Sequence, residues 1–388
     1  MKIIFLIDST FSDRDFERFG INIMFERNVE VLLWDLCKLR HNKIALDFLD
    51  LFEKETNKVK RHIFSSYEEL DDNSIELQNA FLIDKRNGIY RKFTTCWFQD
   101  KGATVIFLDQ GLMPTSIFKP SILDYFRILQ YKFLKNGAKK TLFDIIKLIK
   151  KYSPIKSDQE VCHDIKVCSG SVSVCSNGEY EIRSHSIDYD IYLKEKNKEK
   201  STDNYVVFLD NGAVDHPDFY LLGRSPDCTR DEYFPLMNSF FDYVEKKTKV
   251  PLVIAAHPRL KDLDSMSVDY GGRKVLSGKS AKLVRGAKLV LAHDSTAISF
   301  AALWSIPLLI VTTNQIEKSI YLPMTALSKI LKTTRLNLDF PYNNVNLTKL
   351  AQKPIAEYDE SIDKMIITKG FPMEDSTTIL INHLEKYV

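Results

Sequence analysis

The sequence predicts an α/β protein made of two doubly wound domains. From residue 204 onward, short apolar runs alternate with amphipathic ones, a pattern typical of a parallel sheet covered by helices. The chain opens in a similar way, because the apolar run of residues 2–7 ends at Asp8 and is best interpreted as a buried strand. A length of 388 residues is also sufficient for two domains, each with its own core.

In the first half, five apolar runs are predicted to be strands, over residues 2–7, 29–33, 103–108, 165–167 and 179–182. Ser12 is expected to cap a helix over residues 14–27, and residues 116–151 predict two helices divided near Asn136-Gly137. Residues 50–75 are charged and give no clear pattern. The polar run of residues 194–204, with four lysines and three acids, is interpreted as the linker between the domains.

The second half predicts five more strands, over residues 205–209, 251–256, 274–276, 288–292 and 307–311. Helices are expected between them, over residues 230–245 after a capping box at Thr229, over 281–285 and over 295–304. The expected domains therefore cover residues 1–195 and 203–365, and a C-terminal helix in residues 366–388 is expected to pack back on the first domain.

Composition and charge exclude several classes of protein. The formal net charge of +2 gives no indication of nucleic-acid binding. The six cysteines are scattered without a CxxC pair, which favours reduced thiols in the cytoplasm over a disulfide framework or a zinc site. No signal peptide and no run of about 18 apolar residues is apparent, so we expect a cytoplasmic protein.

Three polar clusters in the second half directly follow predicted strands: Asp210-Asn211-Gly212, His257-Pro258-Arg259 and His293-Asp294-Ser295-Thr296. Ligands of open α/β sheets bind at the carboxyl ends of the strands, so the three clusters are expected to form one site. His257 can donate to a phosphate oxygen, or it can be an ordinary loop histidine. Asp294, Ser295 and Thr296 suit phosphate binding at a helix start, although simple N-capping explains one of them.

Asp109-Gln110-Gly111 ends a strand in the first half. Asp109 is a candidate catalytic base for an acceptor hydroxyl, and Gly111 suits a close backbone approach or a positive φ. A structural turn is the alternative, and Asp210 has the same setting in the second half, so it is the alternative base. Acceptor-binding candidates near the first strand are Asp8, Arg14, Asp15, Arg18 and Gly111.

Two tempting motifs have ordinary interpretations. Gly278-Lys279-Ser280 imitates the end of a phosphate-binding P-loop, but Arg273 stands where that motif needs its first glycine. We interpret the segment as a helix start that lines a nucleotide pocket. Asp188-Tyr189-Asp190 has the spacing of a metal-binding Asp-x-Asp, yet it lies just before the charged linker. We therefore expect no metal and no cofactor.

The ordered motifs Asp109-x-Gly111, His257-Pro258 and Ser295-Thr296 resemble those of bacterial sialyltransferases and related Kdo or nonulosonate transferases. The resemblance implies a GT-B fold, with two Rossmann-like domains facing a central cleft, and a CMP-activated acidic sugar as donor. It implies that the first domain binds the acceptor and the second the nucleotide sugar. Asp109 would then be the base, and His257, Ser295 and Thr296 would hold the donor phosphate. The chain has one acid in the first motif where the family usually has two.

The expected function is therefore metal-independent transfer of an acidic sugar to a glycan or lipid-linked glycan during synthesis of a surface polysaccharide, such as capsule or lipopolysaccharide. Alternatives are a UDP-sugar transferase or epimerase of the same fold, or a non-catalytic assembly partner. Residues 127–156 contain nine Lys or Arg residues and one acid, interleaved with apolar residues. This segment is expected to dock on an anionic membrane surface, although a core helix with solvated lysines is the alternative.

Overall fold

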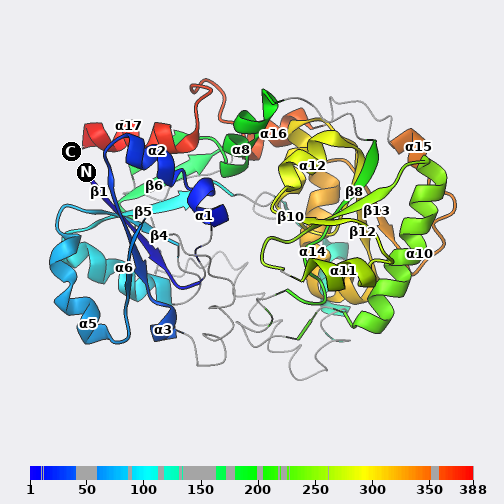
Figure 1. Ribbon diagram of the computed structural model, residues 1–388, viewed down its shortest axis with the longest axis horizontal. Coiled ribbons are helices and arrows are strands. Elements are labelled where there is room, and N and C mark those ends of the chain that lie inside the picture. Colours follow the sequence, from blue (N-terminus) through cyan, green and yellow to red (C-terminus); the bar gives the residue numbers. More distant parts are fainter. Residues whose placement is uncertain are drawn as a thin grey trace. The chain divides into compact units, whose positions relative to one another are not determined.

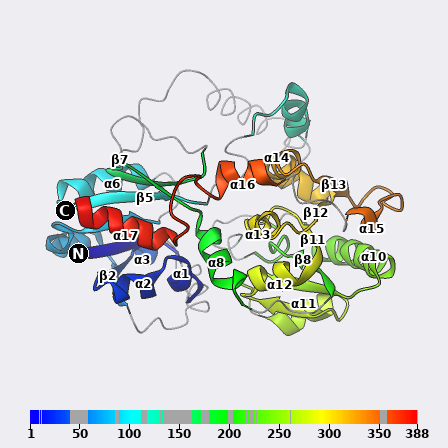
Figure 2. The same cartoon turned by 90° about the horizontal axis from the view of Figure 1, so that it is seen from above.

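A computed structural model describes most of the chain. The described residues are 1–9, 11, 13–40, 59–85, 90–111, 118–130, 133, 163–171, 180–198, 204–216, 219, 225–226, 228–260, 262–350 and 358–387. Contacts between Cα atoms divide the chain into two units. Unit 1 comprises Met1–Leu112, Gln159–Leu193 and Asp363–Val388, and unit 2 comprises Met113–Asp158 and Lys194–Ile362. Each unit is an α/β structure built on its own sheet (Figures 1 and 2).

Unit 1 contains a parallel sheet of seven strands in the order β3-β2-β1-β4-β5-β6-β7. The strands are β1 (Lys2–Ile7), β2 (Glu30–Asp35), β3 (Lys60–Ile63), β4 (Phe81–Asp84), β5 (Thr104–Asp109), β6 (Ile165–Ser169) and β7 (Tyr180–Ser184). The helices are α1 (Asp13–Arg18), α2 (Ile21–Glu26), α3 (Cys37–Arg40), α5 (Tyr67–Asp72), the 3-10 helix η1 (Ser74–Leu77), α6 (Tyr90–Asp100) and α17 (Ser376–Tyr387). Two further helices, α8 (Ile187–Lys196) and α16 (Asp359–Met365), span the borders between the units.

Helices cover both faces of the unit 1 sheet, because alternate residues of a strand point to opposite sides. Ile3, Phe5 and Ile7 of β1 belong to the core formed with α1, α2 and α17. Ile4 and Leu6 belong to the opposite core, formed with α5, η1 and α6. Figure 1 shows α2 and α17 on one side of this sheet and α5 and α6 on the other. The predicted doubly wound arrangement is confirmed for this unit.

The single helix predicted over residues 14–27 is wrong, because the chain forms α1 and α2 with a break between them. Gly20 lies at the break with φ of 62°, the left-handed region that glycine adopts without strain. A Cβ atom at this position would lie 2.3 Å from Oγ1 of Thr377 on α17. The close approach of a helix from the other end of the chain therefore requires the glycine.

Unit 2 contains a parallel sheet of six strands in the order β10-β9-β8-β11-β12-β13. The strands are β8 (Tyr205–Leu209), β9 (Leu252–Ala256), β10 (Val275–Ser277), β11 (Ala287–Ala292), β12 (Leu308–Thr312) and β13 (Thr334–Asn337). The helices are α10 (Arg230–Thr248), α11 (Leu263–Asp269), α12 (Ser280–Gly286), α13 (Ile298–Leu303), α14 (Asn314–Ile330), α15 (Leu347–Leu350) and a helix over residues 122–130. The five strands predicted in this half are confirmed, and β13 is an unpredicted sixth.

Three local predictions need correction. α13 begins at Ile298 rather than at Ser295, because residues 296 and 297 form a turn. Thr229 precedes α10 without a capping bond to the backbone, and its Oγ1 instead donates to Oε2 of Glu232 at 3.1 Å. The predicted linker begins inside α8, which continues to Lys196. The predicted helix division near Asn136-Gly137 and most of the basic segment 127–156 lie outside the described residues.

Candidate functional site

The order of strands in unit 2 places a topological switch point between β8 and β11. The chain runs outward from β8 to β9 and β10, then returns to β11 on the other side of β8. In sheets of this kind, ligands bind outside the carboxyl ends of the strands at the switch point. The residues that follow these two strands, Asp210-Asn211-Gly212 and His293-Asp294-Ser295, therefore flank the expected binding position.

Side-chain contacts join the loops that follow β8, β9 and β11. Nδ2 of Asn211 donates to Oδ1 of Asp294 at 2.5 Å, which connects the two sides of the switch point. The loop after β8 also carries His216, whose ring centroid lies 4.5 Å from that of His257 after β9. The three polar clusters predicted from the sequence thus lie together, and we call them the switch-point site: residues 210–216, 257–259 and 293–296.

Local hydrogen bonding sets the tautomer of His257. Its Nδ1 accepts the backbone N–H of Arg259 at 3.3 Å, within the turn that Pro258 fixes. In a neutral imidazole whose Nδ1 is an acceptor, the proton lies on Nε2. His257 therefore presents an N–H donor, which is the group that a phosphate oxygen requires. Its ring is half-buried beside His216, so its orientation is restrained.

The structure distinguishes Asp294, Ser295 and Thr296. Asp294 is engaged by Asn211, and Oγ of Ser295 accepts the backbone N–H of Ala297 at 3.3 Å. Ser295 thus stabilises the turn before α13, while its hydroxyl proton is available for donation. Thr296 is exposed, and its backbone carbonyl accepts from Ser299 at 2.9 Å.

Gly278, Lys279 and Ser280 connect β10 to α12 at the same edge of the sheet. Gly278 has φ of 70° and open space around its Cβ position, so the backbone conformation rather than crowding favours glycine there. Gly278 and Lys279 are exposed, and Ser280 begins α12. Because β10 pairs with β9, the carboxyl ends of these two strands are adjacent. The lysine is a solvent-accessible cation beyond the strand next to His257.

A buried hydrogen-bonded network lies beneath the switch-point site. Nδ1 of His293 contacts the carbonyl oxygen of Val311 at 2.6 Å, and Nε2 contacts the hydroxyl of Tyr233 at 2.9 Å. A carbonyl oxygen only accepts, so Nδ1 carries the proton and Nε2 accepts from Tyr233. The hydroxyl of Tyr270, buried beside Tyr233, donates to Asp210. Oδ1 of Asp210 in turn accepts the backbone N–H of Gly212 at 2.8 Å.

Burial shifts the pKa values of both ends of this network. Burial lowers the pKa of His293 to about 4, so the ring is neutral near pH 7. Burial also raises the pKa of Asp210 to about 6, against the opposing hydrogen bonds from Gly212 and Tyr270. Both side chains are buried and satisfied by protein groups. Asp210 and His293 therefore shape the site from below, and the side chain of Asp210 is 5% exposed.

In unit 1, Asp109 is the last residue of β5 and pairs with Lys166 on the adjacent strand, with an Nζ–Oδ2 distance of 3.3 Å. Its side chain is 22% exposed, so solvent reaches it. Gln110 is buried, and its Nε2 donates to the carbonyl oxygen of His185 at 3.0 Å. Gly111 is exposed with open space around it. The suggestion of a positive φ at Gly111 is wrong, although the backbone is open to approach.

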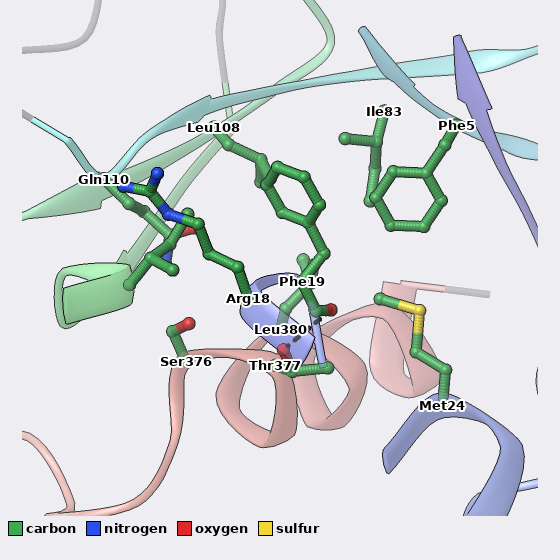
Figure 3. Close-up of a pocket in the computed structure, with 11 residues that line it drawn as sticks. Phe5, Arg18, Phe19, Met24, Ile83, Leu108, Gln110, Ser376, Thr377 and Leu380 are labelled. Carbon is green, nitrogen blue, oxygen red and sulfur yellow. Dashed lines mark hydrogen bonds between the residues drawn. The ribbon is translucent and has the colours of Figure 1, made fainter. Parts of the chain in front are cut away.

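The acceptor candidates near β1 have different surroundings. Asp8 follows β1 and is buried in an ion pair with Arg40. Arg18 contacts Asp188 at 3.6 Å, and Figure 3 shows its side chain extending toward Gln110. The cavity in that figure has a volume of about 10 Å³, enough for a single water and too small for a sugar ring. Arg14 and Asp15 are half-buried on α1.

The Asp-x-Asp segment has structural contacts. Asp188 pairs with Arg18, as described above. Asp190 is buried and accepts the backbone N–H of Ser376 at 2.8 Å, together with its hydroxyl. These bonds satisfy donors at the first residue of α17. The segment therefore anchors the C-terminal helix to unit 1.

The sequence pattern does not indicate the roles of three residues at the switch-point site or beneath it, which are Asn211 as a bridging group, His216 and Tyr233. Asn211 lies inside a motif that was recognised, whereas His216 lies seven residues beyond the end of β8. The sequence signal for His216 is that a third histidine, besides His257 and His293, follows a strand end in the same half of the chain. Tyr233 was hidden in the apolar pattern of α10.

Comparisons with known proteins identify the fold. No protein-family model matches the sequence, and the search of curated proteins gives no match. Among solved structures, the wall teichoic acid polymerase TagF matches 100% of this chain and 89% of its own, with a TM-score of 0.51 and 10% identity. The chain has the GT-B fold.

Two further solved structures have lower TM-scores. The calicheamicin glycosyltransferase CalG4 has a TM-score of 0.49 and 10% identity, and the match covers 100% of this chain and 98% of that one. MurG from Acinetobacter baumannii has a TM-score of 0.48 and 7% identity, with 99% of each chain covered. At such identities the likeness concerns the fold, and the activity has to be argued from the site.

Proposed function

We propose that the protein is a glycosyltransferase that binds a nucleotide-activated sugar at the switch-point site of unit 2. The observation that carries the proposal is the Asn211–Asp294 bond across the switch point, beside a histidine whose Nε2 carries a proton. The GT-B fold supports the proposal. A nucleotide sugar requires donors for its phosphates, and the site supplies an imidazole N–H, hydroxyls and nearby cations.

His257 acts on the leaving nucleotide in this proposal. When the bond between the sugar and the phosphate breaks, negative charge develops on the phosphate oxygen that leaves. The Nε2–H of His257 donates to that oxygen, and its Nδ1 stays bonded to the backbone of Arg259. Ser295, Thr296 and Lys279 provide further donors for the phosphate. These protein groups carry out the charge stabilisation, so the proposed reaction needs no metal ion.

Asp109 is the proposed base that accepts the proton of the acceptor hydroxyl. Its place at the end of β5 and its partial exposure support this role. Lys166 pairs with the carboxylate and orients it. The burial of Asp210 within the hydrogen-bonded network supports Asp109 over Asp210 as the base. We further propose that the acceptor is a glycan or a lipid-linked glycan of a surface polysaccharide.

The proposed donor is a CMP-activated acidic sugar. This choice rests on the order of the motifs Asp109-x-Gly111, His257-Pro258 and Ser295-Thr296, which resembles that of CMP-sugar transferases. A UDP-sugar would fit the same fold, and the test below separates the two donors.

Nucleotide binding tests the proposal directly. We expect CMP to raise the melting temperature more than UDP, GDP or CDP, and a ligand at 100 times its Kd stabilises a protein by about 2.7 kcal/mol. The increase should be smaller in His257→Ala and unchanged in His383→Ala, a control on α17 of unit 1. A larger effect of UDP than of CMP would indicate a UDP-sugar as the donor. The absence of any nucleotide effect would overturn the proposed site.

Turnover separates the remaining alternatives. A transferase releases nucleotide in proportion to the acceptor supplied, whereas an epimerase acts on a UDP-sugar alone. Nucleotide release from UDP-GlcNAc without an acceptor would therefore identify an epimerase. Binding of a nucleotide sugar without turnover on any glycan acceptor would favour a non-catalytic partner in polysaccharide assembly.

A further inference from the structure

A cavity of about 410 Å³ lies in unit 2 between helix 122–130 and α14, on a part of the unit that the proposed function does not use. We call it the α14 cavity. Helix 122–130 is the teal helix of Figure 2. Eleven residues line the cavity: Ser121, Leu123, Asp124, Phe126, Arg127, Gln130, Tyr321, Thr325, Ser328, Lys329 and Arg335.

Asp124 fixes helix 122–130 against α14. Its buried carboxylate accepts from the backbone N–H and the hydroxyl of Ser121, at 2.9 and 2.7 Å. It also accepts from the hydroxyl of Tyr321 at 3.2 Å and from Nζ of Lys329 at 3.0 Å. Burial opposes ionisation of Asp124, but the bonds from Ser121 and Lys329 hold its pKa well below the ordinary value. The carboxylate is thus a charged structural anchor.

Positive charge predominates in the lining of the α14 cavity. Arg127, Lys329 and Arg335 contribute three positive charges against the single negative charge of Asp124, a formal net charge of +2. Glu317, which lies 3.8 Å from Arg335, is buried on α14 and does not line the cavity. The lining also contains the hydroxyl of Thr325, which accepts from Arg335 at 2.7 Å and keeps its own proton for donation, whereas the hydroxyls of Ser121 and Tyr321 donate to Asp124. Three cations beside a hydroxyl donor suit a phosphate group.

Exposed apolar side chains lie at the same place. Leu123 and Phe126 line the cavity and are 70% and 65% exposed, and Ile122 on the same helix is 73% exposed. Three large apolar side chains on one short helix, next to a cationic cavity, form an amphipathic surface. Such a surface suits the boundary between lipid headgroups and acyl chains, where apolar groups insert and cations meet anionic phosphates.

We propose that the α14 cavity binds the phosphate headgroup of an anionic phospholipid while Ile122, Leu123 and Phe126 enter the acyl boundary of the bilayer. Arg127 and Lys329 contact the phosphate, and the cavity is large enough for a phosphate with its glycerol. The sequence from Arg127 to Lys156, with nine basic residues and one acid, adds positive charge next to this helix along the chain. This surface differs from the switch-point site, so it adds a lipid partner to the proposed function.

Co-sedimentation with lipid vesicles tests the proposal. We expect the full chain to bind vesicles of phosphatidylglycerol and phosphatidylcholine more tightly than vesicles of phosphatidylcholine alone, and added salt to weaken the binding. Arg127→Gln should weaken binding about fivefold, because each basic residue near an anionic surface contributes about 1 kcal/mol to the binding free energy. The matched control Lys246→Gln changes an exposed lysine on α10 and should bind as the unmodified chain does.

The apolar side chains are tested separately. The double substitution Leu123→Ser and Phe126→Ser should weaken vesicle binding at least tenfold, and the loss should persist at every salt concentration. Val268→Ser, at a 79% exposed position on α11, is the matched control. Because the substituted side chains are mostly exposed, melting temperatures should change little. Equal binding of the double variant and the control would overturn the proposal.

A soluble anion is the competing occupant. Glycerol phosphate and inorganic phosphate are therefore tested as ligands by calorimetry. Saturable binding of either one that Arg127→Gln abolishes, together with no binding to vesicles, would overturn the lipid assignment. The nucleotide response of the same variants is measured in parallel. A normal response to nucleotide with no vesicle binding would reject only the lipid proposal. Vesicle binding with no response to nucleotide would reject only the proposed donor site.

Discussion

Tyr233 donates its phenolic proton to Nε2 of His293 across 2.9 Å, in the buried layer beneath the switch-point site. The donor direction follows from the other ring nitrogen, because Nδ1 of His293 must donate to the carbonyl oxygen of Val311. One hydrogen bond therefore connects α10 to the end of β11, and a second connects the same ring to the end of β12. The histidine that begins a polar motif in the sequence is a structural group.

Tyr233→Phe should destabilise the protein by about 1–3 kcal/mol, because it leaves Nε2 of His293 buried without a donor. The ring of Phe fills the same space, so packing is retained. Urea denaturation followed by circular dichroism measures the change. Tyr243→Phe is the control, since that hydroxyl makes bonds of 3.3 Å near the surface of the same helix and should contribute less. A cost at Tyr233 no larger than at Tyr243 would contradict this arrangement.

Asp210→Asn should alter the pH dependence of stability. The pKa of Asp210 is about 6 in the folded state against an ordinary value of 3.8, so the folded chain binds more protons between these pH values. Its contribution to stability is therefore full below pH 3.8 and is lost as the pH rises through 6. Asn keeps an acceptor for Gly212 and carries no charge to bury. We expect the variant to gain about 3 kcal/mol relative to the wild type between pH 4 and pH 8.

Urea titrations at each pH measure this difference. Taking the difference between the two proteins cancels the titration of other groups, including His293. That residue has the opposite effect, because its lowered pKa causes stability to fall as the pH drops from 6.5 toward 4. A constant difference between wild type and Asp210→Asn across the range would show that Asp210 has an ordinary pKa.

His257→Ala should lower turnover about 10²–10⁴-fold if the imidazole acts on the leaving phosphate. The fold should be unaffected, because the ring lies in a half-buried loop. Steady-state kinetics with the nucleotide that binds best provide the measurement. His257→Gln, which can present a side-chain N–H, should recover part of the loss. Unchanged turnover in the alanine variant would remove His257 from the mechanism.

Asp109→Asn should reduce kcat by a similar factor while the affinity for nucleotide stays the same, because Asp109 lies in unit 1 and is proposed to act only on the acceptor. The measurement combines kcat with nucleotide titration of the same preparation. Normal turnover would redirect the search for the base to Asp15 or Asp210.

Gly170→Ala should destabilise the protein much more than Gly370→Ala. Both glycines have positive φ, of 68° and 81°, so alanine carries a similar backbone strain of about 1–2 kcal/mol at each position. A Cβ at residue 170 would also lie 2.1 Å from the carbonyl oxygen of Lys364, whereas the space at residue 370 is open. Thermal denaturation compares the two variants. Equal losses would mean that the close approach does not constrain the fold.

The strands that the sequence predicted best are those that are buried along their whole length. β9 and β12 are buried along their whole length, so they appear as continuous apolar runs bounded by polar residues. β13 was not predicted because it is a short edge strand with a polar, partly exposed sequence. The break between α1 and α2 depends on the approach of α17, which local sequence cannot indicate.

The grouping of the candidate site residues was predictable from the sequence, but their surroundings were not. Polar residues after β8, β9 and β11 were predicted to lie together, and they do, because the carboxyl ends of parallel strands share an edge. Asp210 and His293 appeared equivalent to Asp294 and His257 in the sequence. Their burial depends on Tyr233 and Tyr270, which come from α10 and from the turn after α11. Whether a polar residue at a strand end faces ligand or interior is therefore a tertiary property.

The position of α17 has a consequence for synthesis of the chain. Ile379, Leu380 and Leu384 complete a core of unit 1 that begins with Ile3 and Phe5 of the first strand. On the ribosome, this core stays incomplete until almost all 388 residues have emerged. The strands of unit 2 lie between residues 205 and 337, so its sheet is available earlier. Although domains generally fold in N-terminal order during translation, the second unit here has its sheet before the first has its last helix.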